Sequence, residues 1–114
     1  MEEKLVAEKL LEGVVKANLA TYRELFAKTK GEETTDPYWK SALTLFASLN
    51  QKEKETFFAV LKQVSVDAVS NVVGAIDGCT DIGIKEEILL TDKRGRVISG
   101  NLQDLFLAAV ERDG

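Results

Sequence analysis

The chain has 114 residues, of which 45% are hydrophobic and 30% charged, and its net charge is −4 at pH 7. These values are typical of one soluble globular domain, residues 1–114, and exclude a disordered chain. The acidic balance argues against nucleic acid as a partner, because neutralisation of phosphates by Lys and Arg supplies much of the affinity of nucleic-acid binders.

The residue inventory limits the chemistry that the chain can support. It contains no His and a single Cys, Cys79. Without His, the commonest general base and metal ligand is missing, and Ser–His–Asp or Cys–His arrangements are impossible. One Cys cannot form an intramolecular disulfide, which suits a reducing compartment. We therefore expect a non-enzymatic protein that holds no cofactor or metal.

Two further observations favour a cytoplasmic protein that makes no membrane contact. The N-terminus is acidic and helical in pattern and lacks the basic region and apolar run of a signal peptide. The longest apolar-rich stretch, Val64–Ile76, is too short to cross a bilayer and is interrupted by Asp67 and Asn71.

The first predicted element is one long helix over residues 2–29. Its apolar residues recur every three or four positions and share one face: Leu11, Val15, Leu19, Tyr22 and Phe26. A polar segment containing Gly31 follows, and we expect residues 29–36 to be a flexible connector within the domain.

Helix-start signals divide the next forty residues. Asp36 as N-cap and Pro37 at the first helical position predict a second helix. Asn50, with Glu53 three residues later, has the pattern of a capping box and predicts a third. Ser65 is expected to cap a fourth, which ends near Gly78.

A β-hairpin is expected near residues 86–99. The stretches "EEILLT" and "RVIS" flank "DKRG", in which Gly95 suits the left-handed position of a tight turn. Asn101 is then expected to cap a C-terminal helix. The predicted fold class is therefore mainly α, within α+β: four to five helices with one β-hairpin leading into the last helix.

The stretch "TDKRGRVISGNLQDLF" has nearly the rhythm of a calcium-binding EF-hand loop. Counted from Asp92, however, ligand positions 3 and 5 are Arg94 and Arg96, and position 12 is Gln103 instead of Glu. Cations at ligand positions would repel the ion, so a turn and a helix cap explain the stretch better.

An alternative site is the acidic loop and hairpin at 77–92. Its four carboxylates could gather a divalent metal, or the segment could bind a small ligand: Asp77, Asp81, Glu86 and Glu87. Their spacing matches no metal-binding motif, which favours solvated surface residues.

The remaining candidates are surfaces for a protein partner. Trp39 is expected in the core beside Leu43, whereas Tyr38 points away from it. Tyr38 and Trp39 could together anchor a binding patch. Three cations at the predicted hairpin tip, Lys93, Arg94 and Arg96, could meet an acidic surface. The leading hypothesis is a small cytoplasmic protein of the inhibitor, immunity or adaptor type, which acts through contact with a protein partner or with a second copy of itself.

Overall fold

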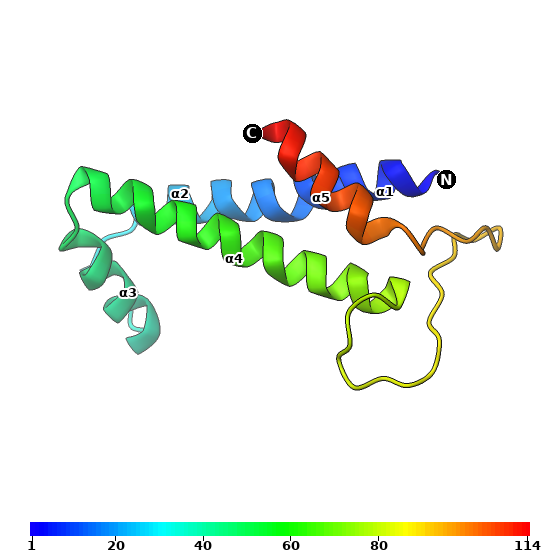
Figure 1. Cartoon of the computed structure of the whole chain (residues 1–114). Coiled ribbons are helices and arrows are strands. Elements are labelled where there is room, and N and C mark those ends of the chain that lie inside the picture. The colour runs from blue at the N-terminus through cyan, green and yellow to red at the C-terminus, as the bar shows by residue number, and fades with distance from the viewer.

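The computed structural model describes residues 1–114, and all its regular secondary structure is helical (Figure 1). The N-terminal helix is one continuous rod built from α1 (Glu3–Leu10), the π-helical segment η1 (Leu11–Lys16) and α2 (Ala17–Lys28). The predicted helix over residues 2–29 is confirmed.

The π-helical segment has a cause in the sequence. Ala7, Leu11, Val15 and Leu19 recur every four residues, and in a pure α-helix each step of four would turn the stripe by about 40°. The i→i+5 turns of a π-helix are wider and absorb this drift. Ala7, Leu11 and Val15 are consequently all buried along one line.

Local capping signals start the next two helices as expected. The polar connector at 29–36 contains one 3-10 turn, η2 (Gly31–Glu33), and α3 (Pro37–Ala47) follows it. The Asp36 carboxylate accepts a hydrogen bond from the Tyr38 N–H at 3.0 Å. At the start of α4 (Gln51–Asp77), the Asn50 and Glu53 side chains each accept the other's backbone N–H at 2.8 Å.

The third and fourth predicted helices are one helix, α4, so the predicted cap at Ser65 is wrong. The Ser65 hydroxyl donates to the Leu61 carbonyl one turn earlier at 2.8 Å, a bond that a serine can make inside a helix. The whole helix has 27 residues and ends where expected, before Gly78, which has φ +83°.

The predicted β-hairpin at residues 86–99 is absent, although the mainly helical character of the chain is confirmed. A single antiparallel bridge joins Thr91 to Val97 around a turn in which Gly95 has φ +83°. The second arm is too short for a ladder, because Gly100, with φ +112°, diverts the chain into α5 (Leu102–Asp113). Residues 86–89 are therefore left without a partner strand.

The start of α5 also differs from expectation, because the Asn101 side chain makes no capping hydrogen bond. The carboxylate of Asp77, at the end of α4, accepts the Gln103 N–H at 2.8 Å and also the Gly100 N–H. Glu3 of α1 accepts the Asn101 N–H at 2.6 Å. Acidic groups from two other helices thus occupy the positive end of the α5 dipole.

Two separate hydrophobic clusters hold the helices together. The larger joins α1, η1, α4 and α5 through eight buried residues: Ala7, Leu11, Val15, Val66, Val73, Leu102, Phe106 and Ala109. The smaller, which we call the aromatic cluster, joins α2, α3 and α4 around Phe26, Leu43 and Phe58, with Trp39, Phe46 and Phe57 packed against them. Because the clusters lie along one rod, the molecule is elongated, 50 × 29 × 25 Å (Figure 1).

Candidate functional site

The two residues at the start of α3 have different environments. Trp39 is half-buried and stacks on Tyr22 with ring centroids 6.0 Å apart, so it belongs to the aromatic cluster. Tyr38 is 63% exposed and touches Trp39 edge-on, with centroids 5.3 Å apart. The pair therefore offers one free aromatic ring.

The three cations Lys93, Arg94 and Arg96 are exposed on the turn before α5. Asp92 organises this turn, because its carboxylate accepts the Arg94 and Arg96 N–H groups at 2.8 and 3.0 Å. The same carboxylate pairs with the N-terminal ammonium at 3.2 Å. The Arg96 N–H above all, together with the ammonium, holds the pKa of Asp92 below its ordinary value.

The structure does not bring these two sets of predicted residues together. Tyr38 and Trp39 lie on α3, and the cationic turn lies at the opposite end of the molecule, beyond the far end of α4 (Figure 1). They cannot form one contact patch on a single protomer.

The alternative site at 77–92 contains a partly open cavity of about 610 Å³ between the end of α4 and residues 78–89. Cys79, which is exposed, and the carboxylates of Asp81, Glu86 and Glu87 line it. No three acidic or thiol side chains in the molecule lie close enough together to hold a metal ion. Asp77 also lines the cavity, but its two oxygens are engaged by the start of α5.

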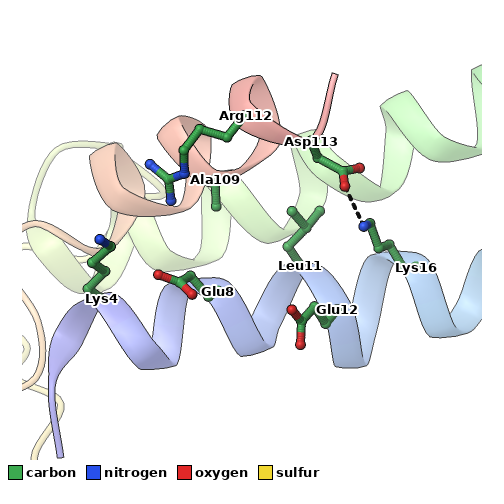
Figure 2. A pocket seen from close by; sticks show the side chains of 8 residues that line it. All are labelled: Lys4, Glu8, Leu11, Glu12, Lys16, Ala109, Arg112 and Asp113. Atoms are coloured by element: carbon green, nitrogen blue, oxygen red, sulfur yellow. Dashed lines mark hydrogen bonds and ion pairs between the residues drawn. The ribbon is translucent and has the colours of Figure 1, made fainter.

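A polar cleft of about 270 Å³ follows the seam between the N-terminal helix and α5. Figure 2 shows charges of both signs along it, with Lys16 and Asp113 joined as an ion pair. Lys62 of α4 also reaches Asp113, at 3.7 Å. The Lys16 hydrogen bond is the main cause that lowers the pKa of Asp113. Asp113 therefore joins α5 to the N-terminal helix through Lys16 and to α4 through Lys62, which gives this end of the cleft a structural role.

Besides these sites, the molecule exposes a face of α4 that the sequence reasoning missed. We call it the outer face, and it consists of Phe57, Val60, Val64, Ala68, Val72 and Ala75. Val60 is 55% exposed, and Val64 and Val72 are each 60% exposed. These positions share one side of the helix by spacing, opposite the buried Val66 and Val73.

Neither charged residue within 57–76 lies in the middle of the outer face. Lys62 points to Asp113 on α5. Asp67 lies at one edge, where it accepts a hydrogen bond from Gln63 of the same helix at 2.9 Å. The centre of the face is therefore uncharged, and Asn71, exposed on the same side of the helix, is the polar residue among its apolar ones.

At its N-terminal end the outer face runs into a shallow hollow between α3 and α4. The hollow has a volume of about 400 Å³, and Leu45, Leu49, Phe57 and Val60 supply its apolar lining. Lys52 and Glu53 stand at its rim. At the C-terminal end lie residues 78–90, where Leu89 is exposed. In Figure 1, α3 and residues 78–90 lie at the two ends of α4 and extend to the same side of it.

The sequence contained a signal for this surface, namely the four-residue spacing of Val60, Val64, Ala68 and Val72. The predicted division of this stretch into two helices at Ser65 concealed it. Only the continuous helix shows that these residues share one side.

The length and composition of α4 alone would allow it to cross a membrane, and 22% of the relevant window is buried. The stretch regarded as too short is thus part of a longer helix. The core helix of a soluble protein meets the same criterion, so this is weak evidence about location.

The surfaces of the molecule itself are the guide to its function, because comparison with known proteins assigns it to no family. No protein-family model, curated protein or solved structure matches it.

Proposed function

We propose that this protein is a non-catalytic cytoplasmic protein that acts through protein–protein contacts, and that the outer face of α4 is its main contact surface. The observation that carries the proposal is the exposure of Val60, Val64 and Val72 on one uncharged helix face. Contiguous apolar patches of this kind are rare on monomeric soluble proteins and mark interaction sites.

The total surface supports the same proposal. A compact monomer of 12.6 kDa would expose about 6,200 Å² by the usual scaling with mass, whereas this chain exposes 8038 Å². The difference of roughly 1,800 Å² exceeds the ~800 Å² that each partner gives to a standard interface. Only 15 of 114 residues are buried, so the isolated chain has little core for its length.

Affinity capture with matched variants tests this function. A tagged chain is exposed to an extract of its native host, which also contains the untagged chain. We expect it to retain a stoichiometric protein, either the untagged chain or another. Val64→Lys should abolish this capture, because it places a charge at the centre of the outer face and leaves the buried clusters untouched.

Ala59→Lys is the matched control. Ala59 is exposed on the same helix but away from the outer face, and a lysine there adds the same charge. Capture should survive this change. No retained protein, or equal retention by all three chains, would refute the proposed function.

A second candidate function, small-ligand binding, is favoured by one observation, the cavity of about 610 Å³ beside residues 78–89. This volume is within the usual range of ligand sites. Cys79 lines the cavity and is exposed. A fluorophore attached there should change its emission when a metabolite mixture contains a ligand, and an unchanged signal would reject this function.

A further inference from the structure

We propose that the outer face of α4 is covered by the same face of a second copy, with the two α4 helices antiparallel about a two-fold axis. This inference rests on the proposed function, because it names the protein that makes the contact. Its first support is the spacing of the six residues of the outer face, 57, 60, 64, 68, 72 and 75.

That spacing is the same in both directions along the helix: three, four, four, four and three residues. It is symmetric about position 66. Two-fold symmetry requires such a self-complementary patch, in which residue i meets residue j and j meets i. A two-fold axis that crosses the contact at the level of residue 66 along the helix pairs Val60 with Val72, Val64 with Ala68, and Phe57 with Ala75.

The paired residues also complement one another in size. Phe57 would meet Ala75, and Val64 would meet Ala68, so a large side chain faces a small one in both pairs. Alternation of large and small side chains across a contact allows helices to interdigitate at the usual axial separation of about 8–10 Å. A parallel pair would instead place Phe57 against Phe57 and Ala75 against Ala75, which leaves a bulge at one end and a gap at the other.

The two ends of the molecule are complementary in the same arrangement. The hollow between α3 and α4 would lie at the same level as the segment 78–90 of the second copy. That segment exposes Leu89 and carries Lys85 and Glu86, while the rim of the hollow carries Lys52 and Glu53. An apolar side chain can thus enter the hollow while Lys52 at its rim is available to pair with Glu86.

The length of the face and the total exposed surface of the chain both support such a contact. Residues 57–75 of α4 extend over about 27 Å at 1.5 Å per residue, and the hollow and the 78–90 segment lengthen the contact at both ends. Each protomer needs to supply ~800 Å² for a standard interface. This is less than half of the roughly 1,800 Å² by which the chain exceeds a compact monomer's surface.

The first test is the mass in solution, measured by sedimentation equilibrium on the full chain. The wild type and Ala59→Lys should have twice the mass of 12.6 kDa at micromolar concentration. Val64→Lys should be a monomer there, with a dissociation constant raised at least about 100-fold and unchanged helical circular dichroism. A wild-type monomer up to millimolar concentration would overturn the inference.

Asp67 provides a variant with the opposite effect. It lies one position from the symmetry centre at the edge of the outer face, so both copies of this carboxylate would approach one another on the same side of the dimer. Asp67→Asn removes this like-charge contact and should tighten the dimer by about threefold or more. A weaker dimer would contradict an axis at position 66.

Disulfide trapping tests the antiparallel direction. In a Cys79→Ser background, Val60→Cys and Val72→Cys chains should cross-link when mixed. Neither should cross-link alone, because two copies of position 60 would lie about 18 Å apart along the axis. Efficient self-linking of Val60→Cys would overturn the antiparallel arrangement.

The two proposals can fail separately. Suppose the wild type is monomeric while Val64→Lys still loses capture of a different host protein. The outer face then serves a heterologous partner, and only the second copy is refuted. The wild type could instead be a monomer that co-sediments with phosphatidylcholine vesicles, while the Val64→Lys chain does not. This pair of results would show that lipid covers the face. That result refutes both proposals.

Discussion

Asp77 stands at the last position of α4 and accepts backbone N–H groups from Gly100 and Gln103 at the start of α5. A carboxylate at a helix N-terminus satisfies free donors and interacts favourably with the helix dipole. Asn101, which precedes the first residue of α5, makes no such bond through its side chain. Asp77, and not Asn101, therefore provides the side-chain cap of α5.

We predict that Asp77→Ala lowers the free energy of unfolding by about 1–2 kcal/mol, the usual cost of a lost helix cap. Asn101→Ala should change it by less than about 0.5 kcal/mol, as for a surface substitution. Urea unfolding followed by circular dichroism measures both values. Equal losses, or a larger loss for Asn101→Ala, would contradict the capping role of Asp77.

Asp92 makes the stability of the folded chain depend on pH in the acidic range. Hydrogen bonds from Arg96 and Arg94 and the nearby ammonium lower its pKa in the folded chain. An unfolded Asp titrates near pH 3.9. Its stabilising contribution is therefore fully present above that pH and is lost as the pH falls through the lower folded pKa.

Asp92→Asn should accordingly reduce the fall in melting temperature between pH 5 and pH 2, measured by thermal unfolding. Part of the fall should remain, because Asp113 also has a lowered pKa through Lys16. An identical pH profile for the variant and the wild type would show that Asp92 does not contribute.

At the scale of elements, local sequence signals predicted where helices begin. They did not predict the features that depend on contacts between distant parts of the chain. The caps at Asp36 and Asn50 involve residues within three positions of each other, so the sequence alone contains the whole interaction. Ser65 failed as a cap because a hydroxyl can also bond backward to Leu61 within a continuing helix. The hairpin failed because Gly100 turns the second arm away, a choice that depends on where α5 docks.

Because the molecule has two separate hydrophobic clusters, we predict that its two ends can unfold independently of each other. Phe26→Leu should destabilise the aromatic cluster by about 1–2 kcal/mol, because Phe26 contacts five other aromatic rings. Hydrogen exchange should then accelerate in α3 and the first half of α4, while α1 and α5 keep their protection.

Phe106→Leu is the reciprocal variant, since Phe106 is fully buried in the larger cluster. It should accelerate exchange in α1 and α5 first. Uniform acceleration along the whole chain in both variants would show a single cooperative unit instead of two.

At the scale of the whole molecule, the elongated shape is the feature that composition least reveals. A compact chain of 114 residues has a radius of gyration of about 13 Å, whereas this one has 17.5 Å. Length and charge suit a rounded domain equally well. The outer face of α4 could not be assigned from sequence for the same reason, because its exposure depends on which side of the helix α1 and α5 cover.

Small-angle scattering on the monomeric Val64→Lys chain should therefore give a radius of gyration close to 17.5 Å. The extended arrangement is fixed by both clusters, so removal of the self-contact should not collapse it. A value near 13 Å would show that α3 or α5 folds back over the outer face when that face is free.

The π-helical segment Leu11–Lys16 has a consequence for how this chain tolerates change in length. Its wider turns keep Val15 and Phe26 aimed at their two clusters over one continuous rod. Loss of a single residue within this segment can be absorbed, because its wider turns then relax to ordinary α-helical turns and the rest of the rod keeps its direction. Loss of a residue from α2 before Phe26 has no such compensation and would rotate Phe26 by about 100°, away from Phe58. The rod therefore tolerates a one-residue deletion in the π-helical segment but not in the helix that follows it.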